Sequence, residues 1–168
     1  MIKKLSWLLL SAMFLFNMAH AQNKNAAQYN NSIIKIQHRV TPDIVEFFKS
    51  FDKGTAEDLK KRQAKLVKDF DAAIAKVTAM PDFEGDGELK KAALDWFRLY
   101  ESSLKNEYDH IITLVANRDR SKEDHAKMDQ MTDDLVKREE GVDAQFEAAQ
   151  NAFAKRHHLE MIERPLKK

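Results

Sequence analysis

The sequence predicts an all-α protein, an up-down-up-down bundle of four long antiparallel helices. Glycine and proline, which interrupt helices, number only 4 and 3 among 168 residues. Apolar residues recur at steps of three and four along four separate stretches, which is the spacing of one buried helix face. The connections between these stretches are short, and short connections place successive helices side by side and antiparallel.

The first stretch predicts a helix from about Tyr29 to Phe51. Pro42 lies inside it. Because proline removes a backbone N–H and clashes one turn back, we expect one helix that is kinked near Pro42. Alternatively, Thr41 caps a second helix that begins at Pro42, but the apolar stripe keeps its phase across the proline and favours one helix. Gly54 then provides a stop signal suited to the left-handed C-cap position.

The second and fourth helices both begin at a capping-box signal, in which Asp takes the place of the usual Glu. Thr55 and Asp58 form the first signal, and Ser121 and Asp124 form the second. Pro81 ends the second helix. Heptad-like steps also allow a coiled coil or a homodimer, so the oligomeric state stays open. The apolar positions of these two helices are Leu59, Leu66, Val67, Phe70, Ile74, Val77, Met80, Met128, Met131, Leu135, Val142, Phe146, Ala149 and Phe153.

The third helix, residues 88–117, is expected to be the spine of the bundle. Asp86 precedes it as a candidate N-cap. The helix carries several large aromatic side chains, so the other helices should pack against it. Its apolar positions are Leu89, Ala92, Ala93, Trp96, Phe97, Tyr100, Leu104, Tyr108, Ile111, Ile112 and Val115.

Residues 1–21 have the pattern of a secretory signal peptide. Lys3 and Lys4 form a basic region, residues 5–18 form an apolar region that is too short to span a membrane, and residues 19–21 form a small-x-small cleavage site. We therefore expect an exported protein, periplasmic or secreted, whose single helical-bundle domain is residues 22–168.

The composition excludes several classes of function. Loss of the two leader lysines changes the formal net charge from +1 to −1, and a near-neutral chain is not expected to bind nucleic acid or anionic membranes in general. No apolar run after the leader is long enough to span a membrane. The chain has no cysteine, which excludes a lipid-modified N-terminal cysteine, covalently attached haem, disulfides and thiolate chemistry.

Four polar residues fall in phase with the apolar stripes: Gln37, Gln63, Glu107 and Glu139. Counting heights from the loops at about 1.5 Å per residue predicts two buried pairs, Gln63 with Glu107 and Gln37 with Glu139. A buried carboxylate needs a donor opposite it, and the glutamine amides can supply one. These pairs are interpreted as contacts that fix the helix register, or alternatively as the walls of a ligand or metal pocket.

Glu107 and His110 form a Glu-x-x-His motif, which places two metal ligands on one helix face in di-iron bundles. Such a site needs a second motif and further glutamates. Glu139 is the nearest candidate in the fourth helix, but no histidine follows it three residues later. Glu107, His110 and Glu139 are thus the candidate metal residues of a minority hypothesis, and no cofactor is expected.

Other motifs have simpler interpretations. The acidic loop before the third helix matches several positions of a calcium loop, but Ala93 stands where the last ligand should be, so an acidic loop with an N-cap is preferred. His157 and His158 are expected at the surface, and so are His110 and His125. No catalytic constellation stands out, and we do not expect an enzyme. The loop acids are Asp82, Glu84, Asp86 and Glu88.

Three stretches carry a resemblance to a known family: residues 28–37, 83–108 and 148–154, which include Gln28-Tyr29-Asn30-Asn31 and Phe83-Glu84-Gly85-Asp86. Together they resemble a family of short, exported, all-helical bacterial envelope proteins described only as surface proteins or as having no known function. Members often carry a lipid-anchoring cysteine, and this chain has none. The resemblance implies a helical envelope protein and supplies no active residues.

Three functional hypotheses follow. The first is a non-enzymatic exported bundle that binds or scaffolds an unidentified envelope protein or small ligand. The second is a metal- or cofactor-binding bundle. The third is a periplasmic stress or chaperone-like protein, which would need an exposed apolar patch larger than a few hundred Å².

Overall fold

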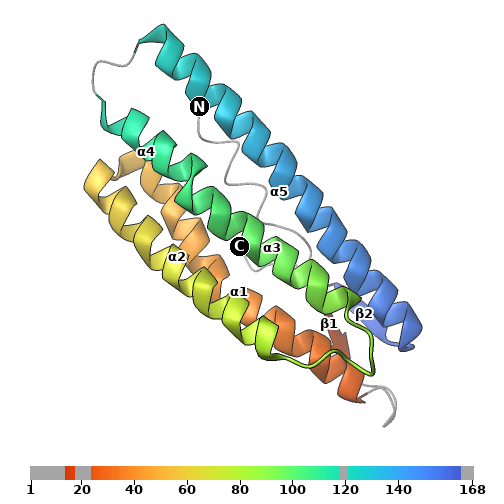
Figure 1. The fold of residues 1–168 in the computed structure, drawn as a ribbon. Helices are drawn as coiled ribbons and strands as arrows, with labels where there is room; N and C mark the ends of the chain where they lie inside the picture. The colour runs from red at the N-terminus through yellow and green to blue at the C-terminus, as the bar shows by residue number, and fades with distance from the viewer. Residues whose placement is uncertain (1–13, 18–23, 118–120, 164–168) are drawn as a thin grey trace.

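A computed structural model of the chain describes residues 14–17, 24–117 and 121–163 and has the predicted all-α four-helix architecture (Figure 1). α3 and α4 follow one another along nearly one line and together take the place of the predicted third helix. The helices are α1 (Lys24–Lys53), α2 (Ala56–Ala79), α3 (Glu88–Lys105), α4 (Glu107–Ala116) and α5 (Lys122–Arg156).

Two short strands accompany the helices, and the sequence patterns did not indicate them. β1 (Phe14–Asn17) pairs antiparallel with β2 (Glu160–Glu163). β1 lies inside the segment interpreted as a signal peptide. Cleavage after Ala21 would therefore remove the strand that pairs with β2.

α1 continues as one helix through Pro42, as the phase of its apolar stripe predicts. The hydroxyl of Thr41 donates to the carbonyl of Gln37 over 3.0 Å. The bend expected at Pro42 stays a prediction. Gly54 follows the helix for a different reason from the one expected, because its φ is not positive. Its N–H donates to the carbonyl oxygen of Ser50 over 2.6 Å, and a Cβ atom on Gly54 would lie 2.5 Å from that oxygen.

Both predicted capping boxes are present. The Thr55 hydroxyl accepts a hydrogen bond from the Asp58 N–H over 3.1 Å, and the Asp58 carboxylate accepts one from the Thr55 N–H over 3.1 Å. Ser121 and Asp124 exchange the same two bonds at the start of α5. Each box satisfies backbone donors that a helix start would otherwise leave unpaired.

The predicted third helix is interrupted at Asn106, which corrects the expectation of one continuous helix. Asn106 has φ −112° and ψ −77°, away from helical values. Its side-chain amide donates to the carbonyl of Ser102 over 2.8 Å and to the Ser102 hydroxyl over 3.2 Å. Asparagine side chains compete in this way with the backbone hydrogen bonds of a helix. The interruption changes the direction in which the side chains after residue 106 point.

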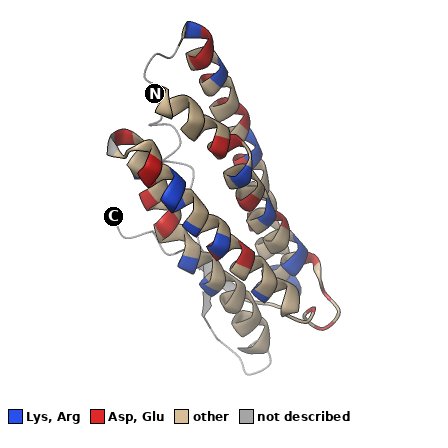
Figure 2. Ribbon diagram, turned by 60° about the vertical axis from the view of Figure 1, so that its left-hand side comes forward, with Lys and Arg blue, Asp and Glu red and all other residues tan. Residues whose placement is uncertain are grey.

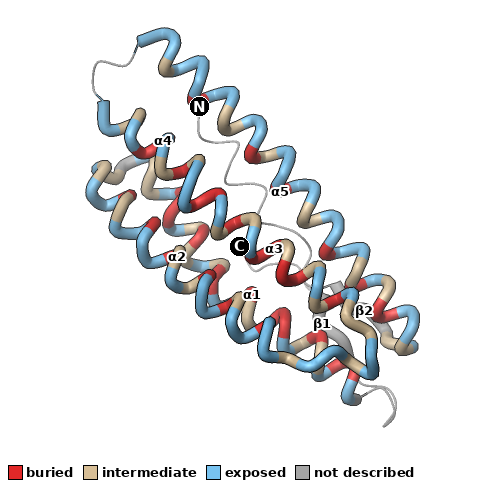
Figure 3. Tube along the Cα trace, viewed as in Figure 1, coloured by how far each residue is buried: buried red, intermediate tan, exposed pale blue. Residues whose placement is uncertain are grey.

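The core lies along the axis of the bundle, with α2 packed against α1 and α3, and α5 packed against α3 and α4. Buried residues line the inward sides of the helices (Figure 3). α1 and α5 meet at one end, where the Gln150 amide donates to Asn30 Oδ1 over 3.1 Å and Tyr29 stacks on Phe153 with ring centroids 5.8 Å apart. The largest fully buried side chains are Tyr108, Phe47, Phe70, Phe97, Phe153, Ile33, Ile34, Leu59, Leu66, Leu89, Ile112 and Leu135.

The first turns of α5 extend past the end of α4 and are largely exposed (Figures 1 and 3). Acidic and basic residues are interspersed along the described helices (Figure 2). Among the helices that the structure describes, none combines the length and hydrophobicity that crossing a bilayer requires.

Candidate functional site

A cluster of polar and aromatic side chains lies inside the bundle, where α5 packs on α3 and α4. We call it the acid cluster and define it as Trp96, Tyr100, Tyr108, Glu139 and Asp143. The residues on α3 are four apart, and so are those on α5. That spacing places each pair on one helix face.

Tyr108 joins three helices. Its hydroxyl donates to Glu139 Oε1 over 3.0 Å. Its ring meets the rings of Phe47 and Phe48 on α1 at centroid distances of 5.6 and 5.5 Å. Tyr108 and Glu139 are 1% and 2% exposed. A buried carboxylate thus has a donor from the protein core.

Asp143 has its own donor one turn further along α5. The indole N–H of Trp96 donates to Asp143 Oδ1 over 2.6 Å. Tyr100 lies close enough to both acids for their charges to act on it, and its ring is stacked on Phe70 at 6.0 Å with an interplanar angle of 7°. The Tyr100 hydroxyl is buried and has no hydrogen-bond partner among the described residues. It therefore lacks the compensation that most buried hydroxyls have.

Burial changes the proton affinity of both acids. Desolvation raises the pKa of Glu139 to about 7, although the hydrogen bond from Tyr108 lowers it and the charge of Asp143 raises it. Desolvation likewise raises the pKa of Asp143 to about 6, against the lowering effect of the Trp96 hydrogen bond. Burial also raises the pKa of Tyr100 and Tyr108, so both stay protonated. The acid cluster can therefore bind and release a proton near neutral pH.

Gln63 is buried as predicted, but Glu107 is not its hydrogen-bond partner. The Gln63 amide donates to the carbonyl of Leu104 over 2.6 Å and to Asp109 Oδ1 over 3.0 Å. Lys60 also pairs with Asp109. Leu104 and Asp109 lie on either side of Glu107 in the sequence. The position predicted for Gln63 along the bundle axis was therefore nearly correct. The direction was wrong because the interruption at Asn106 turns Glu107 towards α5 and Asp109 towards α2.

Gln37 and Glu139 are both buried as predicted, but Glu139 bonds to Tyr108 and the pairing was wrong in height. Tyr108 lies eight residues before the end of α4, and Glu139 lies seventeen after the start of α5. If the loop joined the end of α4 and the start of α5 at the same height, these two residues would differ in height by nine residues, or about 14 Å. Because they are in contact, α5 is displaced by about that distance along its axis. The prediction assumed that successive helices begin and end at the same height. The displacement of α5 instead places Glu139 beside Tyr108.

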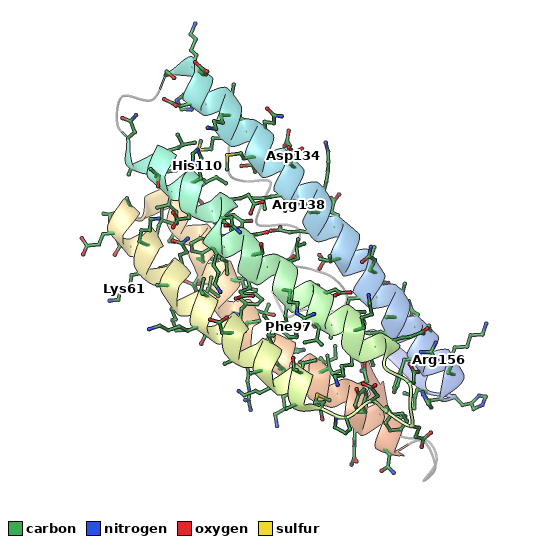
Figure 4. The ribbon with its side chains drawn as sticks, in the orientation of Figure 1. Lys61, Phe97, His110, Asp134, Arg138 and Arg156 are labelled. Carbon is green, nitrogen blue, oxygen red and sulfur yellow. The ribbon has the colours of Figure 1, made fainter. Side chains whose placement is uncertain are left out.

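The three candidate metal residues do not converge. Glu107 forms an ion pair with Arg138 of α5, Glu139 bonds to Tyr108, and His110 is exposed. Figure 4 shows His110 on α4 and Arg138 on the next helix, with Phe97 among the core side chains. Within residues 24–117 and 121–159, no group of three or more histidine and acidic side chains is arranged to hold a metal ion.

The acidic loop before α3 binds the end of α5. Asp86 accepts a hydrogen bond from the Glu88 N–H over 3.1 Å and pairs with Arg156 Nη2 at 2.6 Å. Glu88 also pairs with Arg156, at 2.9 Å, and Figure 4 shows Arg156 at the end of α5 beside this loop. Lys90 pairs with Asp82 at 3.3 Å. Cations therefore pair with three of the four acids that the calcium hypothesis would use. The N-cap of α3 is Gly87 and not Asp86 as predicted, and the Asp86 carboxylate caps the N–H of Glu88 from one residue further out.

His157 was expected at the surface, but it packs inward. Its ring lies 4.9 Å from Phe83 and 4.4 Å from Phe153, measured between ring centroids. It therefore closes the apolar end of the bundle. The one sequence signal for this position is that His157 lies four residues after Phe153, which places both on the same helix face.

Sequence reasoning identified Glu139 and missed the roles of Trp96, Tyr100, Tyr108 and Asp143. The apolar stripe places the aromatic residues in the core but does not indicate partners for their polar atoms. The available signal was the step of four from Glu139 to Asp143 on the buried side of α5, opposite two tyrosines and a tryptophan.

No protein-family model, no curated protein and no solved structure matches this chain.

Proposed function

We propose that this chain is an exported, non-enzymatic helical-bundle protein of the bacterial cell envelope that binds or scaffolds a partner there. The basic, apolar and small-x-small segments of residues 1–21 support export. The resemblance to helical envelope surface proteins supports the location. The absence of cysteine argues against a lipid anchor.

The observation that carries the non-enzymatic assignment is the way the buried acids are bonded. Glu139 and Asp143 receive their hydrogen bonds from Tyr108 and Trp96, which are core side chains. General acids and bases instead lie within hydrogen-bond reach of a substrate. Acids with partners inside the core are typical of contacts that fix how helices pack.

The partner is an envelope protein or a small ligand. Mixed charge covers the helices (Figure 2), which does not favour a polyanion such as nucleic acid. A second copy of the chain is a further possible partner because the heptad-like steps allow it. Cross-linking in intact cells followed by mass spectrometry tests these options. A discrete adduct with an envelope component or with a second copy supports the proposal, and a protein that stays monomeric without any adduct contradicts it.

Export is tested with the full chain carrying a C-terminal tag. Cell fractionation should recover it outside the cytoplasm, and mass spectrometry should find a mature chain beginning near Gln22. Replacing Lys3 and Lys4 with glutamate should reduce export, because a signal peptide needs its basic region. Full-length protein found only in the cytoplasm would exclude the proposal.

The metal-binding alternative has its own test. Purified protein should contain no stoichiometric metal, and iron, zinc or calcium should leave its melting temperature unchanged, since a ligand that binds the folded state raises that temperature. A bound metal that is lost in Glu139→Gln would favour the alternative instead. Glu147→Gln, at an exposed position of the same helix, is the matched control.

A further inference from the structure

The middle of α5 places two acids, Glu139 and Asp143, against the bundle. Between Leu135 and Phe146 along α5, Glu139 is the only residue in the buried class, and Val136 and Val142 are partly buried against the core. Asp143 follows Glu139 one turn later and is partly buried. Elsewhere α5 is held by apolar side chains such as Phe153. The state of these two carboxyl groups therefore affects how well the middle of the helix packs.

Each acid has a donor from the core, and two unpaired polar atoms lie nearby. Tyr108 and Trp96 supply one donor to each acid. The hydroxyl of Tyr100 and Oε2 of Glu107 are buried and have no hydrogen-bond partner among the described residues. A proton on either acid removes a buried charge and adds a donor, because a protonated carboxyl group donates through its O–H and still accepts through its other oxygen.

We propose that Glu139 and Asp143 form a proton-operated latch, which holds the middle of α5 against α3 and α4 when it carries a proton and loosens when both carboxyl groups are charged. Two charged acids one helical turn apart repel each other, and each loses hydration when α5 packs. The helix is weakest between them, because Gly141 lies there. Loosening would uncover the aromatic faces of Trp96, Tyr100 and Tyr108.

The surroundings of the latch contain little compensating positive charge. The charge of Arg138 lowers the pKa of Glu139, but Arg138 is also paired with Glu107. Among the described residues, the titratable and charged groups that act on the two acids include Tyr100 of α3, Tyr108 and Glu107 of α4, and Arg138 and Glu140 of α5 itself.

The direction of the pH dependence follows from the folded pKa values. Glu139 has a folded pKa of about 7 against an ordinary value of 4.5, and Asp143 about 6 against 3.8. Between the ordinary and folded values, the packed state holds more protons than the loosened state. Packing of α5 is therefore strongest below the ordinary pKa values of the two acids. It weakens as the pH rises towards and through their folded pKa values.

Hydrogen exchange on the purified protein, made from the full-length gene, tests the latch. After correction for the intrinsic rate, amides of residues 136–146 should exchange at least about tenfold faster at pH 8 than at pH 5.5, since each unit of pKa shift is a factor of ten in the equilibrium. Amides of α2 should change much less. Equal protection of residues 136–146 at both pH values would overturn the proposal.

Matched variants separate the latch from a general pH effect. Glu139→Gln and Asp143→Asn keep the shape and remove the charge, so each should reduce the pH dependence and the two together should abolish it. Glu147→Gln at an exposed position of α5 should behave as wild type. An unchanged pH dependence in the double variant overturns the proposal. If that variant does not fold, the wild-type exchange profile and the two single variants still decide it.

Discussion

Tyr108 of α4 donates a hydrogen bond to Oε1 of Glu139 of α5 over 3.0 Å, and both side chains are almost completely buried. The same tyrosine ring packs on Phe47 and Phe48 of α1. One side chain thus connects three helices and supplies the donor for the most buried acid of the bundle.

Tyr108→Phe should keep the ring contacts and remove the donor to Glu139. We expect a loss of about 1.5–3 kcal/mol in the free energy of unfolding at pH 8, where the acceptor is charged, and about 1 kcal/mol at pH 5. Urea denaturation at the two pH values measures this difference.

Tyr100→Phe is the matched comparison, because the Tyr100 hydroxyl is buried without a partner. Its removal should change stability by less than about 1 kcal/mol or increase it, since an unpaired buried hydroxyl is itself unfavourable. Equal losses in the two tyrosine variants would show that the hydrogen bond to Glu139 contributes nothing.

Gln63→Ala should destabilise the bundle by about 1–3 kcal/mol, because it leaves the carbonyl of Leu104 without its side-chain donor beside the interruption at Asn106. The free energy of unfolding from urea denaturation measures this loss. Lys61→Ala is the control, because Lys61 lies two residues away on the exposed side of α2 (Figure 4). Indistinguishable losses in both variants would contradict the role assigned to Gln63.

Acid should destabilise the helix starts. Hydrogen bonds from Thr55 lower the pKa of Asp58, and hydrogen bonds from Ser121 lower the pKa of Asp124, both below the ordinary value of 3.8. A lowered folded pKa adds stability that is present above the ordinary value and is lost as the pH falls through the folded value. Helicity measured by circular dichroism should therefore fall steeply below about pH 3.8.

The double variant Asp58→Asn, Asp124→Asn should lose helicity less steeply in this range than wild type does. Asp129→Asn, at an exposed position of α5, should follow the wild-type curve. A double variant with the wild-type acid profile would contradict the assignment of this acid sensitivity to the two capping boxes.

The fold could be predicted from the sequence because short-range sequence patterns indicate where each helix lies. The stripe from Tyr29 to Phe51 keeps its phase through Pro42, and α1 is one helix there. The pairs Thr55–Asp58 and Ser121–Asp124 mark helix starts that the structure confirms. These signals depend on neighbouring residues alone, so a single sequence contains them.

The partners of the buried polar residues could not be predicted as reliably, because they depend on two non-local quantities. The interruption at Asn106 rotates Glu107 away from Gln63, and its only local signal is an asparagine inside an apolar pattern. The extension of α5 past α4 moves Glu139 from the level of Gln37 to that of Tyr108. That offset is set by packing between helices, which helix periodicity does not encode.

The most direct measurement is the titration of the Glu139 carboxyl group by ¹³C NMR, with Glu139→Gln used to assign its signal. The account predicts a midpoint near the value of about 7 that burial gives this group, and a smaller change near the value of about 6 for Asp143. A Glu139 midpoint near its ordinary value of 4.5 would show that the group is hydrated in solution. It would contradict both the buried contact with Tyr108 and the latch that depends on it.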